Sequence, residues 1–446
     1  MRTGRLARTA VPLRLVGTAA LRWLGTFRHR GERREEKRKE AVLRTSEDVT
    51  RAMGEMKGAA MKVGQVLSML SGVVPPEMAE GLARLQADAP PMAFELVEEV
   101  LEVAYGRSPA AVFRSLEREP FAAASIGQVH RAVLWDGSRV AVKVQYPGVR
   151  EAIERDLANV AVLLGLGGLV AKGLDIGTLV RDLGEGIRGE LDYRREAAWQ
   201  QRFFDVFEGH AFVRVPRVYH ELTTETVLVQ EWLPGRPFRE ALRLSQAERN
   251  RLGEMIYRFC FGSLYRHGLF NGDPHPGNYL LLGDGRIGFV DYGCVAEFDA
   301  AVIEGFKRLI RALDRGDREG WRAATEALGI LLPDAPFTTE ELYEHMHWYW
   351  APILEDEVEY TPELAGEMVR RNTMTTGIGG RINRFCNIPA GMVFLTRINF
   401  GLAGLLASLR ARGPWRAIVR EYVEGLAPST ELGRRSAEST RWGQPI

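Results

Sequence analysis

Asp273, Asn278 and Asp291 have the types and the spacing of a phosphoryl-transfer site. Asp273 and Asn278 are the ends of Asp-Pro-His-Pro-Gly-Asn, and Asp291 begins Asp-Tyr-Gly further along the chain. Phosphoryl transfer needs an acid near the nucleophile and oxygen ligands for Mg²⁺, which Asp-x-x-x-x-Asn and a later Asp-aromatic-Gly supply together. Two polar turns around a hairpin would use the same residue types. These motifs therefore need a partner elsewhere in the sequence.

Lys143 is that partner. It lies in Arg139-Val-Ala-Val-Lys-Val-Gln145, where strict alternation predicts a half-buried strand with Lys143 on the face opposite the valines. The turn signal Trp135-Asp-Gly-Ser138 precedes it, so we expect a strand pair with its loop over Phe121–Leu134. A lysine on such a strand can hold nucleotide phosphates. A solvated strand lysine is the alternative, which the accompanying motifs disfavour.

The bulk composition limits the class of protein. The chain has 446 residues, 46% of them hydrophobic and 26% charged, with a net charge of +1. Near neutrality argues against nucleic acid as the main partner, because phosphate backbones are bound by an excess of basic residues. The three cysteines are too widely spaced for a disulfide framework or a metal site, which predicts no disulfides and fits a cytoplasmic protein.

The N-terminal segment is basic and no stretch is long and apolar enough to span a membrane. Residues 1–31 contain seven arginines and no acidic residue, interleaved with leucine and aromatic residues. Such a segment could lie on an anionic membrane surface or direct the chain to an organelle. A mobile basic tail is the alternative of equal weight. The sequence therefore predicts a cytoplasmic protein with a peripheral membrane location or organelle targeting left open.

Turn and helix signals divide the chain into five segments. We expect a basic N-terminal segment (1–45), a helical extension (46–118), a small lobe with inserted helices (119–235), a helical large lobe (236–430) and a flexible tail (431–446). One long helix is predicted over 178–204, and strands are predicted over 217–221 and 226–232. From Ser245 onward the pattern is mostly helical, apart from a hairpin at Gly283-Asp-Gly285.

From about residue 57 to residue 299, the motifs resemble those of the UbiB-type (AarF-related) atypical kinases, a protein-kinase-like group associated with isoprenoid-quinone metabolism. The first motif contains Ala122, Ala123, Ala124 and Ser125 where a protein kinase has a glycine-rich loop, and the resemblance implies that it contacts the nucleotide phosphates. The β-carbons restrict the backbone, so we expect a stiffer loop.

Two further motifs carry the resemblance. Lys62-Val-Gly-Gln65 places Lys62 and Gln65 on one face of the N-terminal helix, and the resemblance implies that this helix folds over the cleft and blocks protein substrates. In Glu190-Leu-Asp192 and the later Glu196, the two glutamates are about 120° apart on a continuous helix and would not share one partner. The resemblance implies that Glu196 pairs with Lys143 and Glu190 with Lys62. A solvated acidic helix face is the alternative.

The catalytic loop departs from the family pattern. Many relatives read His-Ala before the aspartate, whereas this chain has Asn271-Gly272, which puts the rigidity of the loop and the rate in question. The resemblance implies that Asp273 orients the nucleophile or accepts its proton. It also implies that Asn278 and Asp291 bind Mg²⁺ and that Lys143 binds the phosphates of ATP. Glu231, before a predicted hinge, is expected to present backbone atoms to adenine.

The resemblance implies an α+β, protein-kinase-like fold with a small β-rich lobe, a helical large lobe and an N-terminal helical extension. It implies an ATP- and Mg²⁺-dependent kinase or ATPase that supports quinone or lipid metabolism at a membrane surface, with a quinone precursor or lipid as partner. A small-molecule phosphotransferase of the aminoglycoside or choline kinase type has a similar loop but lacks the Lys62 motif. A non-catalytic, nucleotide-gated lipid-binding scaffold is the third hypothesis.

Overall fold

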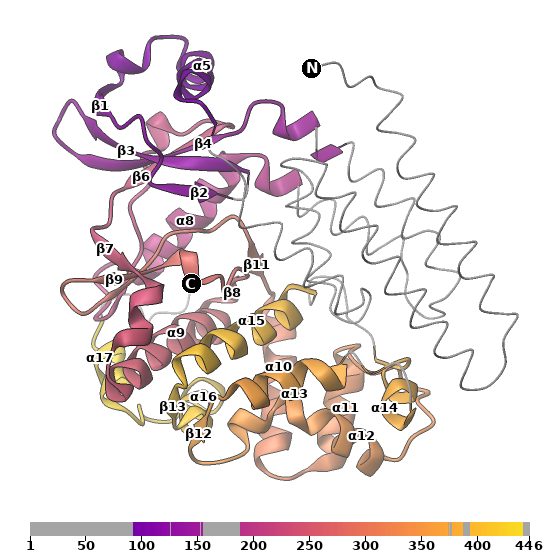
Figure 1. Ribbon diagram of the computed structural model, residues 1–446. Helices are drawn as coiled ribbons and strands as arrows, with labels where there is room; N and C mark the ends of the chain where they lie inside the picture. Colours follow the sequence, from indigo (N-terminus) through magenta and orange to yellow (C-terminus); the bar gives the residue numbers. More distant parts are fainter. Residues whose placement is uncertain are drawn as a thin grey trace, which may run out of the picture. The chain divides into compact units, whose positions relative to one another are not determined.

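The computed structural model describes residues 92–124, 126–151, 153–154, 188–372, 374, 377–386 and 393–439 (Figure 1). They form two compact units. The first takes its residues from the ranges Met1–Pro109, Glu117–His130 and Lys143–Leu191, and the second from Ala110–Leu116, Arg131–Val142 and Asp192–Ile446.

A five-stranded sheet has the order β1-β3-β4-β6, with β2 paired to β3. Its strands are β1 (Phe113–Leu116), β2 (Ala122–Ala124), β3 (Gly127–Leu134), β4 (Arg139–Gln145) and β6 (Val227–Glu231). The predicted strand pair before Lys143 is confirmed, because β2 and β3 pair antiparallel with Ala124 opposite Gly127. Glycine is needed at this point, since a β-carbon on Gly127 would lie 2.1 Å from the carbonyl oxygen of Val144.

The predicted turn between β3 and β4 is also confirmed. The amide of Leu134 donates to the carbonyl of Ser138, and the amide of Ser138 donates to the side chain of Asp136 at 2.8 Å. Gly137 has φ +88°, the left-handed region that glycine adopts without strain. The tight turn brings β4 back beside β3 in the sheet.

Two expectations for this sheet were wrong. β4 is not half-buried: every residue from Val140 to Gln145 is buried, so both faces of the strand are covered. The range 46–118 is not helical throughout, because β1 pairs antiparallel with β3. The helix α5 (Phe94–Tyr105), followed by the 3₁₀ turn η1 (Pro109–Ala111), does lie in that range.

Smaller sheets form part of the second unit. One has the order β5-β10-β9-β7 and another pairs β11 with β8. The strands are β5 (Val213–Arg214), β7 (Gly235–Pro237), β8 (Leu269–Asn271), β9 (Tyr279–Leu282), β10 (Ile287–Phe289) and β11 (Val295–Glu297). A third pair joins β12 (Val358–Glu359) to β13 (Arg412–Gly413). β9 and β10 form the hairpin expected around Gly285, whose φ is +81°.

Helices make up most of the second unit, as the sequence predicts after Ser245. The α-helices are α8 (Tyr193–Phe207), α9 (Gln246–His267), α10 (Ala300–Asp314), α11 (Arg318–Ala327), α12 (Thr339–Met346), α13 (Pro362–Asn372), α14 (Gly377–Ile382), α15 (Val393–Leu409), α16 (Trp415–Val423) and α17 (Glu431–Ala437). The 3₁₀ helices are η2 (His220–Leu222), η3 (Phe238–Arg243), η4 (Pro276–Asn278), η5 (His347–Tyr349) and η6 (Ala351–Ile353).

α9 is the central helix of this unit, with α15 and α16 packed against it (Figure 1). It begins after Ser245, whose hydroxyl and the carboxylate of Glu248 form a reciprocal capping box. It ends at His267, and the next residue, Gly268, adopts φ +64° as the C-cap. Twelve of its residues are buried, so the helix belongs to the core rather than to an amphipathic surface.

Three further expectations were corrected. The predicted helix over 178–204 is broken, because Leu191 and Asp192 are not helical and the Asp192 side chain caps α8 by accepting from the amide of Arg194. Only Val218 makes a single bridge where a strand over 217–221 was expected. The segment 431–446 is not a flexible tail as far as residue 439, since α17 buries Leu432 and Ser436.

No helix among the described residues is long and apolar enough to cross a membrane. The three cysteines, Cys260, Cys294 and Cys386, are free thiols, in agreement with the expected lack of disulfides.

Candidate active site

The loop between β8 and β9 carries Asp273 and Asn278. β8 ends at Asn271, which pairs with Val295 of β11, and η4 ends at Asn278 immediately before β9. His275 precedes η4, and its Nδ1 accepts the amide of Gly277 at 3.1 Å. The loop is thus held between two β-structures at its ends and by a local cap at its centre.

Asn278 closes the loop onto Asp273. Its side-chain Nδ2 donates to the backbone carbonyl of Asp273 at 3.2 Å. The backbone carbonyl of Asn278 accepts the amide of Val290 at 3.1 Å. Because the amide nitrogen is engaged, the side-chain oxygen of Asn278 is the atom suited to a cation. The second contact connects the loop to the residue just before Asp291.

Asn271 joins the two halves of the site. Its Nδ2 donates to the carbonyl of Asp291 at 2.9 Å, and its Oδ1 accepts the amide of Asp273 at 3.2 Å. The residue is buried, with 8% of its surface exposed. Asn271 therefore braces this loop. An asparagine that directly precedes Gly-Asp is the sequence signal for this side-chain turn.

Asp291 is held at the turn after β10. Its Oδ1 accepts the amide of Gly293 at 3.0 Å. The neighbouring Tyr292 is fully buried, and its hydroxyl donates to the carbonyl of Phe289 at 3.2 Å. Burial, and then the charge of Asp291, raise the pKa of Tyr292 well above its usual value, so the phenol stays neutral. Tyr292 thus anchors the turn by packing and one hydrogen bond.

Glu196 approaches the same turn from the first helical turn of α8. A β-carbon added to Gly293 would lie 3.3 Å from Oδ1 of Asp291 and 3.5 Å from Oε2 of Glu196. Glu196 is buried, with 4% of its surface exposed. The second unit therefore brings Asp273, Asn278, Asp291 and Glu196 into one region. The motifs of the sequence placed the first three of these residues there.

The donor set fits a hard cation. A carboxylate from Asp291 and an amide oxygen from Asn278 are ligands that Mg²⁺ accepts, and Mg²⁺ normally completes its shell with phosphate oxygens and water. Within the described ranges there is no group of three or more His, Cys, Asp and Glu residues that could hold a metal by itself. The site thus suits a cation that arrives with a nucleotide.

Lys143 lies on β4 in the first unit, with 7% of its surface exposed. The alternative interpretation of Lys143 as a solvent-exposed strand residue is therefore wrong. A buried ammonium group requires polar partners.

Ala122, Ala123 and Ala124 form β2 rather than an open loop. Glu190 is half-buried and precedes the break at Leu191. Because that break interrupts the helix, the 120° separation expected between Glu190 and Glu196 does not apply.

Three predicted residues, Lys62, Gln65 and Ser125, lie outside the described residues. The pairings of Lys143 with Glu196 and of Lys62 with Glu190 stay predictions.

Glu231 is the last residue of β6, and its carboxylate contacts two arginine residues. It pairs with Arg214 at 2.6 Å and accepts the amide of Arg217 at 3.1 Å. Its own amide donates to the carbonyl of Arg217. The expected adenine contact of Glu231 can therefore not use this N–H group.

Comparison with known proteins identifies the family. Residues 84–325 match the family described as "ABC1 atypical kinase-like domain". The chain belongs to this family of atypical kinase-like proteins, which includes UbiB and AarF. The resemblance drawn from the motifs is therefore confirmed.

Relatives and one solved structure support the assignment. The chain is 35% identical to "Uncharacterized protein slr0889" of Synechocystis, covering 61% of this chain and 71% of that protein. It is 34% identical to "Atypical kinase COQ8B, mitochondrial" of Rattus norvegicus and 33% to "Atypical kinase COQ8, mitochondrial" of Saccharomyces cerevisiae. These matches cover 61% and 64% of this chain. The chain spans 52% and 57% of the length of these two kinases.

A structure titled "The complex structure of Rv3197-erythromycin from Mycobacterium tuberculosis" matches with a TM-score of 0.64 and 32% identity. The match covers 87% of this chain and 98% of that one. The α+β, protein-kinase-like fold expected from the sequence is thus confirmed.

Proposed function

We propose that this protein is an Mg²⁺-dependent, ATP-binding atypical kinase or ATPase that supports isoprenoid-quinone or lipid metabolism at a membrane surface. The observation that carries the proposal is the bonded unit in which Asn271 and Asn278 fix the backbone of Asp273 next to Asp291. Family membership supports nucleotide use, and the COQ8 relatives support the link to quinones.

Each residue has a role in this proposal. Asp291 and the side-chain oxygen of Asn278 would hold Mg²⁺, which neutralises charge on the phosphates when bound. Asp273 orients the attacking hydroxyl or water and accepts its proton as the bond between that oxygen and the γ-phosphorus forms. The bond between the γ-phosphorus and the bridging oxygen breaks, and ADP leaves. Lys143 would contact the α- and β-phosphates of ATP.

The phosphoryl acceptor separates the competing functions. With water as acceptor the protein is an ATPase, and with a lipid or quinone-precursor hydroxyl it is a kinase. The resemblance of Gly272-Asp273 and Asn278 to the loop of small-molecule phosphotransferases favours a small hydroxyl substrate over a protein. A nucleotide-gated scaffold would bind Mg-ATP without turnover. Residues 1–31 would supply the membrane contact or the organelle signal, as the mitochondrial names of the relatives suggest.

Substitution of Asp291 tests the proposal. Asp291→Asn removes the anionic metal ligand, so Mg-ATP affinity measured by calorimetry is expected to fall about tenfold or more, and turnover by about a hundredfold or more. Asp284→Asn is the matched control, because Asp284 is exposed in the β9–β10 turn and forms a surface ion pair with Arg286. Unchanged Mg-ATP binding and turnover in Asp291→Asn would contradict the proposed metal site.

A further inference from the structure

Gln230 is a buried glutamine on β6 to which the proposed nucleotide chemistry gives no role. Only 7% of its surface is exposed, and the residues of β6 that precede it are buried as well. Its Nε2 donates to the backbone carbonyl of Val290 at 3.3 Å, although the two residues are 60 positions apart in the chain. Val290 directly precedes Asp291. The side-chain amide of Gln230 is therefore bonded to the peptide group that leads into the proposed metal ligand.

The partner of Gln230 determines how its side-chain amide is oriented. A carbonyl oxygen can only accept a hydrogen bond, so the nitrogen of Gln230 must face Val290. The oxygen, Oε1, is then buried without a donor among the residues that the structure describes. An unpaired buried acceptor is unfavourable, and it offsets the hydrogen bond that the nitrogen makes. Gln230 therefore contributes little net stability, so its value to the protein must lie in what the bond to Val290 holds in place.

Side-chain amides constrain the peptide groups on both sides of Asp291. The peptide group between Val290 and Asp291 is planar, so the bond from Gln230 to the Val290 carbonyl constrains the whole plane. The peptide group after Asp291 is constrained by Asn271, whose Nδ2 donates to the Asp291 carbonyl at 2.9 Å. These two planes meet at the α-carbon of Asp291. Together they define the direction in which its carboxylate leaves the backbone.

We propose that Gln230 is a positioning residue for the metal site, because it holds the peptide group before Asp291 in the orientation that lets the carboxylate meet Mg²⁺. Loss of a group that orients a metal ligand typically lowers metal affinity or activity about 10- to 100-fold. Asn271 acts on the other side of the same ligand, so the two side chains have separate bonds and one shared effect. This inference rests on the proposed role of Asp291 as a ligand of Mg²⁺.

Gln230→Met tests the inference, since it removes the amide and keeps a side chain of similar length. The calorimetric Kd of the full chain for Mg-bound AMP-PNP, a non-hydrolysable analogue of ATP, should rise about tenfold. The Mg²⁺ concentration that half-saturates ATP turnover should rise by a similar factor. Because the lost bond and the removed unpaired oxygen offset each other, the melting temperature should change by less than about 4 °C.

Gln200→Met is the matched control, because Gln200 has the same bonding pattern with a different partner. Gln200 is 0% exposed, and its Nε2 donates to the carbonyl of Pro216 at 2.8 Å. Its Oε1 is likewise buried without a donor in the described part of the chain. Pro216 belongs neither to the catalytic loop nor to the Asp291 turn. The variant should match Gln230→Met in melting temperature and keep the Kd for Mg-bound AMP-PNP within about twofold.

The outcomes separate this inference from the proposed function. A rise in Kd for Gln230→Met that Gln200→Met does not share supports the positioning role. An unchanged Kd for Gln230→Met, an equal rise in both variants, or a melting temperature far below that of Gln200→Met would overturn the inference and leave the proposed metal site standing. If the unsubstituted chain did not bind Mg-bound AMP-PNP, the proposed function would be wrong and the inference with it.

Discussion

At the scale of single residues, the geometry of the proposed site depends on side chains that form hydrogen bonds to the backbone of Asp273 and Asp291. The side-chain amide of Asn271 has one oxygen and one nitrogen. The oxygen accepts the amide of Asp273, and the nitrogen donates to the carbonyl of Asp291. A change at this position therefore affects both aspartates of the proposed site at once. Asn278 adds a third connection through the carbonyl of Asp273.

Replacing Asn271 tests whether this side chain positions Asp273 and Asp291 for ATP turnover or only stabilises the fold. Asn271→Ala leaves the carbonyl of Asp291 and the amide of Asp273 without this partner, which costs about 1–3 kcal/mol of stability. We expect kcat for ATP turnover to fall about ten- to a hundredfold, with a smaller change in the affinity for Mg-ATP, because the brace affects orientation more than charge. Stopped assays of ADP release and calorimetry measure the two effects.

Asn271→His is the rescue variant, since an imidazole can donate to the Asp291 carbonyl. It should recover at least part of the lost kcat. If Asn271→Ala turned over ATP at the unsubstituted rate, the brace would have no role in positioning.

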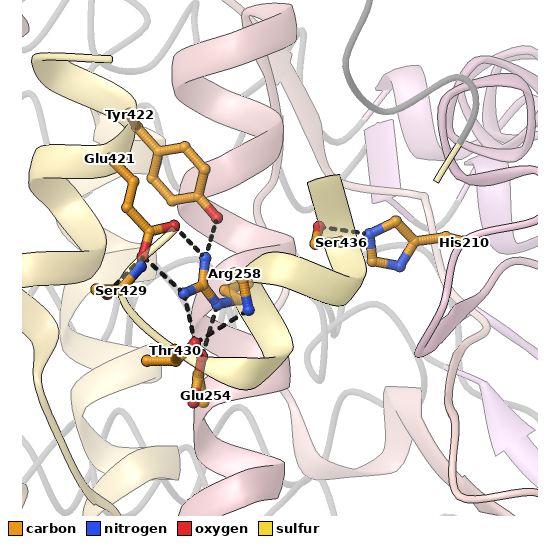
Figure 2. Close-up of polar contacts among 9 residues, drawn as sticks. His210, Glu254, Arg258, Glu421, Tyr422, Ser429, Thr430 and Ser436 are labelled. Carbon is orange, nitrogen blue, oxygen red and sulfur yellow. Dashed lines mark hydrogen bonds and ion pairs between the residues drawn. The ribbon is translucent and has the colours of Figure 1, made fainter. Parts of the chain in front are cut away.

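His210 predicts how stability depends on pH. Burial, and after it the charges of Arg258 and Arg266, lower the pKa of His210 to about 3. Its Nδ1 accepts the amide of Val213 at 3.2 Å, and its Nε2 lies 2.9 Å from the Ser436 hydroxyl (Figure 2). The folded state keeps this ring neutral, whereas the unfolded chain takes up a proton below about pH 6.5.

His210 therefore favours unfolding as the pH falls from about 6.5 toward 3, by up to about 1.4 kcal/mol per pH unit. His210→Gln can still accept from a backbone amide and donate to Ser436, but it does not titrate. Urea unfolding at pH 7 and pH 5 should show a smaller loss of stability for this variant than for the unsubstituted chain. An equal loss in both proteins would show that His210 does not titrate on unfolding in this range.

At the scale of elements, the sequence predicts what local patterns encode. Alternation located β4, the Asp-Gly turn located the hairpin before it, and Ser245 marked the start of the helical region that begins with α9. The motif spacing also placed Asp273, Asn278 and Asp291 together. Each of these features depends on residues that are near one another in the chain, so short-range rules suffice.

The features that the sequence did not predict depend on distant contacts. The burial of both faces of β4 and the pairing of β1 with β3 are set by neighbouring strands. The break before α8 depends on one aspartate that caps a helix instead of continuing it. Arg258 is separated by 163 residues from its partner Glu421, and neither residue has a local signal for the pair.

α15 contacts the catalytic loop through Gly401. A β-carbon at this position would lie 2.2 Å from Cγ of Pro274, the residue after Asp273. Gly401→Ala must therefore displace the helix or the loop, with a cost of about 1–3 kcal/mol, and should lower kcat for ATP turnover about tenfold. Melting curves and ADP-release assays measure the two changes.

Gly404→Ala is the matched control in the same helix, because a β-carbon there meets no atom within 4 Å. It should stabilise the protein by about 0.5–1 kcal/mol, since alanine is the better helix former. Loss of turnover in both variants would implicate the helix as a whole rather than the contact with Pro274.

At the scale of the whole molecule, the C-terminal elements close the second unit around α9. Arg258 of α9 forms a bidentate pair with Glu421 of α16 and also bonds Tyr422 and Thr430 (Figure 2). Burial alone would raise the pKa of Glu421, but Arg258 and then Ser429 lower it, so the pair is ionised at neutral pH. Thr430 caps α17, so the same cluster fixes the start of the last described helix.

Arg258→Met is the corresponding prediction for the stability of this unit. The side chain of Arg258 is 2% exposed and that of Glu421 is 3% exposed, so removing the guanidinium leaves a buried carboxylate without its main cation. The free energy of unfolding should fall by about 3–5 kcal/mol. Arg370→Met is the matched control: Arg370 pairs with Glu367 at the surface, where such a pair contributes about 0–1 kcal/mol. Urea denaturation measures the free energy of unfolding of both variants. A similar decrease in the two variants would show that the buried pair does not hold the C-terminal elements in place.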